Sequence, residues 1–110
     1  MAGKFVVKTA SNGETYFRLQ AGNGETILKS EMYASKASAL NGIESVRKNA
    51  TDDARYERKT AASGQFMFNL KAANHQIIGT SETYKSEASR EGGIASVKTN
   101  APSAKVDDQT

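Results

Sequence analysis

The chain has 110 residues, of which 37% are hydrophobic and 25% are charged, and its net charge is +3 at pH 7. The absence of cysteine excludes disulfides, thiolate metal sites and a cysteine nucleophile, and the single histidine, His75, argues against a histidine-based catalytic triad or zinc site. No apolar run of useful length follows Met1, and no segment reaches the ~20 apolar residues of a membrane span. We therefore expect a cytoplasmic protein with no membrane partner.

The sequence repeats itself once. Residues 5–51 align with residues 56–102 without a gap, and roughly two aligned positions in five are identical. Each unit is too short to bury much apolar surface alone, so we expect the two units to share one core. The prediction is a single domain over 1–110, with repeat 1 at 4–51 and repeat 2 at 55–102.

Each repeat is predicted to begin with three short antiparallel strands. Alternating apolar and polar residues, punctuated by glycine-containing turns, indicate these strands. The predicted strands are 4–9, 15–20 and 26–33 in repeat 1, and 56–60, 65–71 and 77–84 in repeat 2. The turns fall at Asn12-Gly13, Asn23-Gly24, Ser63-Gly64 and Asn74-His75.

A helix is predicted to follow the strands in each repeat, with Ser35 and Ser86 as N-caps. An apolar stripe indicates the buried side of each helix. The stripe residues are Ala37, Leu40, Ile43 and Val46 in repeat 1, and Ala88, Ile94 and Val97 in repeat 2. Residues 51–55 are predicted to be a linker, and 103–110 a disordered tail because they show no periodic pattern.

These elements predict an α+β fold of two tandem βββα repeats related by a pseudo-twofold axis, with antiparallel strands packed against two helices. We expect one shared core, made of Phe5, Phe17, Leu19, Ile27, Tyr56, Phe68, Leu70 and Ile78 from the strands and Ile43, Val46, Ile94 and Val97 from the helices. The pattern leaves open whether the six strands form one sheet or two facing sheets. Gly42 and Gly93 lie inside the helices, and we expect each to permit a close approach of its helix to a neighbour.

A motif at the end of the third strand and along the helix occurs in both repeats. It has the form SE-x-Y-x-S-x-AS followed by GI-x-SV-x-x-NA, beginning at Ser30 and again at Ser81. This doubled motif resembles the YegP-like family of small bacterial proteins. The resemblance implies a βββα unit, present in one copy or two, without an assigned activity, catalytic residue or cofactor.

Glu31 and Glu82 are the acidic residues that the repeat places at equivalent positions. If the pseudo-twofold axis ran between the third strands, these glutamates could form paired carboxylates that share a proton or hold a divalent cation. The alternative is that each side chain bonds local backbone N–H groups near the start of a helix.

A basic and aromatic sheet surface is the second candidate site, of the kind that stacks single-stranded bases. Its predicted residues are Lys4, Lys8, Tyr16, Arg18, Lys29, Lys59 and Lys71. The alternative is an ordinary solvated sheet face, because Met67 and Asn69 replace Tyr16 and Arg18 in repeat 2.

The chain offers no recognisable catalytic set, so the leading hypothesis is a non-enzymatic binding or interaction module without a cofactor. A protein partner ranks first, and an exposed sheet edge would give such a partner a route for strand addition. The alternatives are weak nucleic-acid binding through the basic repeat 1, and a small ligand or metal at Glu31 and Glu82. We expect the tandem protein to be a monomer that acts as an internal pseudo-dimer.

Overall fold

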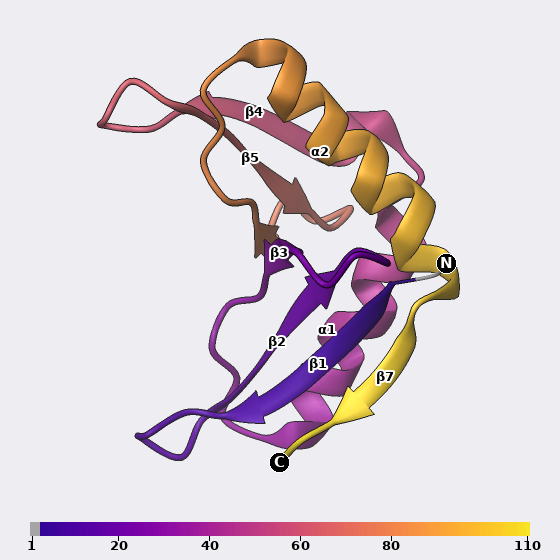
Figure 1. Cartoon of the computed structure of the whole chain (residues 1–110). Helices are drawn as coiled ribbons and strands as arrows, with labels where there is room; N and C mark the ends of the chain where they lie inside the picture. Colours follow the sequence, from indigo (N-terminus) through magenta and orange to yellow (C-terminus); the bar gives the residue numbers. More distant parts are fainter. Residues whose placement is uncertain (1–2) are drawn as a thin grey trace.

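The computed structural model describes residues 3–110. A single seven-stranded sheet runs through both repeats in the order β4-β5-β6-β3-β2-β1-β7, which decides between one sheet and two. Both helices pack against strands of both repeats (Figure 1). The elements in chain order are β1 (Lys4–Thr9), β2 (Thr15–Gln20), β3 (Thr26–Lys29), α1 (Lys36–Asn49), the 3-10 turn η1 (Asp53–Arg55), β4 (Tyr56–Thr60), β5 (Phe66–Lys71), β6 (Ile77–Thr80), α2 (Glu87–Asn100), the 3-10 turn η2 (Ala101–Ser103) and β7 (Lys105–Asp108).

The pseudo-twofold axis passes between β3 and β6. These strands are antiparallel neighbours, and the residues paired at their junction are Lys29 and Thr80, which are equivalent positions of the two repeats. The two three-stranded meanders therefore join through their third strands, and β1 and β4 lie far apart in the sheet. No helix among residues 3–110 is long and apolar enough to cross a membrane.

The predicted third strands, 26–33 and 77–84, are too long. β3 ends at Lys29, where Ser30 breaks the strand: the Ser30 hydroxyl accepts the N–H of Phe17 at 2.9 Å and donates to the carbonyl of Glu31 at 2.7 Å. The chain returns to the sheet at Tyr33, which forms an isolated bridge with Thr15. The N–H of Phe17 thus donates to a serine hydroxyl where a regular strand would offer a main-chain carbonyl. An alternating strand pattern in the sequence does not reveal this exchange. The same interruption occurs in repeat 2.

Both predicted helix caps are confirmed, since the hydroxyls of Ser35 and Ser86 each accept an N–H three residues later at 3.1 Å. The predicted apolar stripe is wrong in its first half, because Ala37 and Ala88 are exposed and Leu40 is 36% exposed. Steps of three residues drift around a helix of 3.6 residues per turn. The buried residues of α1 instead follow the i, i+3, i+4 pattern: Ala39, Gly42, Ile43, Val46 and Asn49.

Gly42 and Gly93 allow close packing, as expected. A Cβ atom at Gly42 would overlap the hydroxyl of Tyr33, and it would lie 2.8 Å from the Cζ atom of the same ring and 3.0 Å from Cε2 of Phe17. At Gly93 the equivalent distance to Cζ of Tyr84 is 2.7 Å. Each helix thus rests on a tyrosine ring that a larger residue would displace.

The predicted core is confirmed, because all twelve of its residues are at most 8% exposed: Phe5, Phe17, Leu19, Ile27, Tyr56, Phe68, Leu70 and Ile78 with Ile43, Val46, Ile94 and Val97. Aromatic rings continue this core toward the helix starts. Tyr33 stacks on Phe17 with ring centroids 6.1 Å apart, and Tyr84 stacks on Phe68 at 6.4 Å.

The prediction of a disordered tail over 103–110 is wrong. Residues Lys105–Asp108 form β7, which runs parallel to β1 at the edge of the sheet, and the N–H of Gln109 donates to the carbonyl of Val7 at 2.9 Å. Ion pairs from Asp107 to Lys4 and from Asp108 to Lys36 reinforce this pairing. The main-chain groups of an open sheet edge can pair with a further strand that has no apolar pattern. Hydrophobic periodicity therefore did not predict β7.

Candidate functional site

The sheet face opposite the core carries most of the predicted basic surface. In β1 and β2 the core residues alternate with residues of the other face, since successive side chains of a strand point to opposite sides. Lys8 pairs with Tyr16, Val6 pairs with Arg18, and Arg18 pairs in turn with Lys29 of β3. The register therefore brings these side chains together on one face, which we call the outer face.

Tyr16 is the centre of a cationic cluster on the outer face. The Cζ atom of Arg18 lies 5.5 Å from the centroid of the Tyr16 ring, and Nζ of Lys29 lies 5.8 Å from it. Arg18 also donates to the Tyr16 hydroxyl at 3.4 Å. Within residues 3–110, Lys8, Arg18 and Lys29 form no ion pair. We call Lys8, Tyr16, Arg18 and Lys29 the Tyr16 cluster. Its cations are not engaged in ion pairs within the described chain, and Lys29 at its end shares a hollow with Glu31 and Glu82.

The outer face of repeat 2 has a different chemistry. Glu57 forms an ion pair with Lys71 at 2.9 Å and accepts a hydrogen bond from Asn69 at 3.1 Å, and Asn69 in turn accepts one from Thr80 at 2.9 Å. The hydrogen bond from Lys71, followed by that from Asn69, lowers the pKa of Glu57 below its ordinary value. Lys71 is therefore held in an ion pair within the chain. The acid Glu57 occupies the middle of the outer face of repeat 2.

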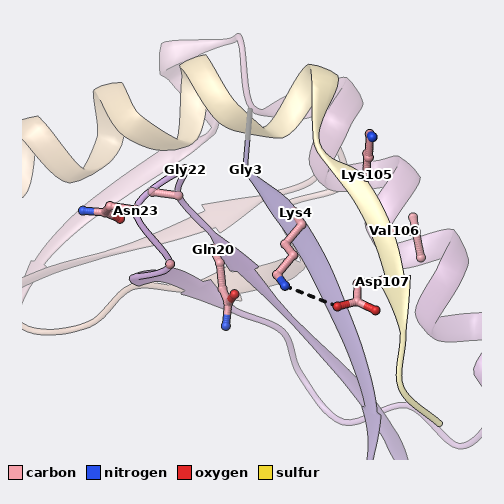
Figure 2. A pocket seen from close by; sticks show the side chains of 10 residues that line it. Gly3, Lys4, Gln20, Gly22, Asn23, Lys105, Val106 and Asp107 are labelled. Atoms are coloured by element: carbon pink, nitrogen blue, oxygen red, sulfur yellow. Dashed lines mark hydrogen bonds and ion pairs between the residues drawn. The ribbon is translucent and has the colours of Figure 1, made fainter. Parts of the chain in front are cut away.

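The predicted surface thus divides into a clustered part and a dispersed part. Lys59 pairs with Met67 at the far edge of the sheet, away from the Tyr16 cluster. Lys4 lies at the other end of β1 and forms an ion pair with Asp107 of β7 at 3.3 Å (Figure 2). The structure joins Lys8, Tyr16, Arg18 and Lys29 and separates Lys4, Lys59 and Lys71 from them.

An open hollow of about 750 Å³ lies beside Lys4, between β7 and the turn that follows β2. Figure 2 shows Gly22 and Asn23 on one side of it and Lys105, Val106 and Asp107 on the other. Its one ion pair is the Lys4–Asp107 contact that also anchors β7. The hydrogen bond from Gln109 and the one from Lys4 lower the pKa of Asp107, so this carboxylate is already engaged.

Glu31 and Glu82 line one shared hollow of about 420 Å³ at the pseudo-twofold axis, together with Lys29, Ser30, Thr80 and Ser81. Their backbone carbonyls accept the hydroxyls of Ser30 and Ser81, while neither carboxylate side chain takes part in a hydrogen bond within the described chain. Burial first, and the charge of Glu31 second, raises the pKa of Tyr33. Residues 3–110 contain no group of three or more acidic or histidine side chains arranged to hold a metal ion.

Sequence reasoning missed one residue of the outer face, Val6. Val6 lies on this face between the positions of Lys4 and Lys8, and it is only 4% exposed. The equivalent position in repeat 2 is Glu57, the acid that engages Lys71. The aligned repeats already showed Val6 at the position of Glu57. The consequence for the outer face could be read only once it was known which side of the strand faces the core.

The fold and the outer face define a class: a small α+β protein of two tandem repeats whose sheet is covered by helices on one side. A model of the family described as a domain of unknown function, DUF1508, matches residues 10–57 and 61–108. The chain belongs to this family. The second match extends through β7, and the first ends two residues into β4.

The relatives of the chain are full-length matches. It is 58% identical to the UPF0339 protein YegP of Escherichia coli K12 over 110 residues, covering 100% of both chains. It is 59% identical to a UPF0339 protein encoded in the ptx operon 5′ region of Stutzerimonas stutzeri over 106 residues, covering 96% of each.

Two solution NMR structures are similar. One is YegP of Escherichia coli, described as a protein of unknown function, with a TM-score of 0.95, 58% identity and coverage of 100% of this chain and 95% of that one. The other is a UPF0339 protein of Shewanella oneidensis, with a TM-score of 0.92, 49% identity and coverage of 98% and 92%. The YegP-like resemblance and the α+β tandem fold are confirmed.

Proposed function

We propose that this protein is a non-enzymatic binding module whose outer face in repeat 1 binds single-stranded nucleic acid. The observation that supports this function is the Tyr16 cluster: an aromatic ring flanked by Arg18 and Lys29 on the sheet face opposite the core against which the helices pack. Single strands are held by two interactions, base stacking on aromatic rings and attraction between phosphates and cations. The cluster offers both within one surface.

The lack of ion pairs at the three cations of the cluster, among the described residues, favours an anionic ligand. A cation that already forms an ion pair must lose that partner before it binds a phosphate, as Lys71 would have to lose Glu57. Lys8, Arg18 and Lys29 face no such cost. A single tyrosine stacks any base, so we expect binding with little sequence preference. Glu31 and Glu82 mark the end of this surface at the pseudo-twofold axis.

The test is fluorescence anisotropy of a labelled oligothymidylate titrated with the full-length protein at several salt concentrations. Three phosphate contacts predict a slope of about −2 in the plot of log affinity against log salt concentration. Tyr16→Ala should weaken binding about tenfold, because base stacking contributes roughly 1–3 kcal/mol. Lys59→Ala, on the outer face of repeat 2, is the matched control and should change the affinity less than about twofold.

Two results would contradict the proposal. Equal effects of Tyr16→Ala and Lys59→Ala would show that binding is a property of net charge and not of the cluster. Binding of an acidic polypeptide such as polyglutamate, without binding of the oligonucleotide, would assign the same surface to an acidic protein partner.

A further inference from the structure

A second group of cations lies beyond the Tyr16 cluster, at the other end of β1. Lys4 is on the outer face two positions before Val6, and it pairs in register with Lys105 of β7, so the two lysines lie side by side. Within the described chain Lys105 takes part in no ion pair. The outer face along β1 therefore carries positive charge at both ends, Lys8 at one and Lys4 with Lys105 at the other.

The carboxylate of Asp107 lies between these two groups. Asp107 of β7 pairs in register with Val6, which pairs on its other side with Arg18 of the Tyr16 cluster. Two strand spacings, or about 10 Å, therefore separate Asp107 from Arg18, which is within a Debye length at low salt. Asp107 also forms an ion pair with Lys4 at 3.3 Å (Figure 2). Its negative charge thus acts on both groups of cations.

Asp107 can oppose a phosphate because it remains accessible. Its side chain is 38% exposed, and that of Lys4 is 48% exposed. Two protein donors, Lys4 and the side-chain amide of Gln109 at 2.9 Å, bind its Oδ2 atom. At the opposite end of the Tyr16 cluster, Glu31 and Glu82 form no ion pair within residues 3–110. Of these three acids, Asp107 alone holds a cation that a phosphate would otherwise reach.

Asp108, the next residue of β7, carries the same charge on the other side of the sheet. It pairs in register with Val7, a core residue, and its ion pair is with Lys36, the first residue of α1. Successive side chains of a strand point to opposite sides. Asp108 therefore anchors β7 without facing the Tyr16 cluster. A comparison of the two aspartates separates the anchoring of the strand from the charge on the outer face.

We propose that Asp107 is a built-in competitor that sets the length of the surface on which a single strand binds, which rests on the nucleic-acid binding proposed for the Tyr16 cluster. Asp107 holds Lys4 and separates Lys4 and Lys105 from the cluster. A bound strand is thereby confined to the three cations of the cluster. The C-terminal strand inhibits binding along the remainder of β1.

The test measures the anisotropy of a labelled oligothymidylate of about ten nucleotides, which is long enough to extend beyond the cluster. Full-length wild-type protein is compared with Asp107→Asn. We expect the variant to bind about fivefold more tightly at low salt, because at least one further phosphate is contacted. The slope of log affinity against log salt concentration should steepen from about −2 to about −3. The matched control Asp108→Asn should keep the slope of the wild type and change the affinity less than about twofold.

A second pair of variants shows whether the gain acts through Lys4. Alone, Lys4→Ala should weaken binding less than about threefold, because this lysine is already held by Asp107. Combined with Asp107→Asn, it should remove most of the gain, since contacting residues are not additive. The amide signal of Gln109, which donates to the carbonyl of Val7, reports whether β7 stays paired. We expect this signal to be the same in both aspartate variants.

Three results would overturn the role of Asp107 and leave the proposed function standing. They are an unchanged salt slope in Asp107→Asn when the wild type binds as expected, equal gains from Asp107→Asn and Asp108→Asn, and release of β7 in Asp107→Asn alone. The second would show that net charge decides the affinity, and the third would assign the gain to loss of the strand. Binding of the oligonucleotide by none of the proteins would contradict the proposed function itself, and the role of Asp107 with it.

Discussion

On the helix-covered side of the sheet, the two repeats share the packing of their aromatic rings on the helix glycines, while Val7, Leu28 and Ala39 correspond to Arg58, Gly79 and Arg90. Phe17 and Phe68 stack on Tyr33 and Tyr84 at 6.1 and 6.4 Å, and each tyrosine hydroxyl meets a helix glycine. On the outer face the repeats differ at nearly every functional position. Tyr16, Arg18 and Lys29 correspond to Met67, Asn69 and Thr80.

The comparison shows that packing keeps the stacked aromatic rings and the helix glycines the same in both repeats, whereas the charged and aromatic residues of the outer face have diverged. Where repeat 1 has Val6, Arg18 and Gln20, repeat 2 has Glu57, Asn69 and Lys71, and the glutamate there bonds to both the lysine and the asparagine. The two edges of the sheet have diverged as well. β1 has β7 as an additional neighbour, whereas β4, its counterpart, is the last strand of the sheet. Function, in this account, belongs to the parts of the two repeats that are unlike.

The largest expected effect concerns the shared side. Gly42→Leu should lower the free energy of unfolding by on the order of 3 kcal/mol, because its side chain must displace the ring of Tyr33. Gly92→Ala is the matched control, since a Cβ there meets no atom within 4 Å. That change should raise stability by about 0.5–1 kcal/mol through helix propensity. Chemical denaturation checks both, and an unchanged stability for Gly42→Leu would contradict the packing explanation.

The next prediction transfers the chemistry of repeat 2 to repeat 1. Val6→Glu places a carboxylate among Lys8, Arg18 and Lys29, and we expect it to weaken oligonucleotide binding roughly tenfold at low salt. Val6→Gln has a similar size without the charge and controls for the cost of altering a buried position. Anisotropy titrations compare the two variants. A similar loss of affinity in both variants would mean that the larger side chain, and not its charge, weakens oligonucleotide binding.

A smaller effect is expected at the β1 edge when the pH falls. The hydrogen bond with Lys36, followed by those from Thr110, lowers the pKa of Asp108 to about 2. Its pKa in the unfolded chain is about 3.9, so its stabilising contribution is complete above that pH and is lost as the pH falls toward 2. The protection of the Gln109 amide against exchange, relative to the intrinsic rate at each pH, should therefore fall between about pH 4 and pH 2. Lys36→Gln should remove most of this pH dependence, and a retained dependence would contradict the ion-pair explanation.

Much of the fold could be predicted because it depends on local rules. Turns with glycine at positive φ, as at Gly13 and Gly64, serine caps and alternating strands all leave a pattern in the sequence. The fourth turn departs from the rule, because His75 adopts φ 68° where repeat 1 has Gly24. What escaped prediction depends on non-local main-chain bonds: β7 beside β1, and Ser30 in place of a strand residue.

The candidate site was predictable in composition and not in arrangement. The sequence named all four residues of the Tyr16 cluster, but it grouped them with Lys4 and Lys71, which the structure pairs with Asp107 and Glu57. Ion pairs between strands depend on register and on the side of the sheet that each residue faces. Neither is visible until the strands are placed side by side.

The most direct test of the account compares the two repeats within one spectrum. The labelled full-length protein is titrated with an unlabelled oligothymidylate at near-physiological salt, and amide shifts are compared at equivalent positions. We predict shifts at Lys8, Tyr16, Arg18 and Lys29 that weaken as salt is raised, with little change at their counterparts Lys59, Met67, Asn69 and Thr80. A silent spectrum, or shifts of equal size in both repeats, would contradict the claim that the outer face of repeat 1 is the binding surface.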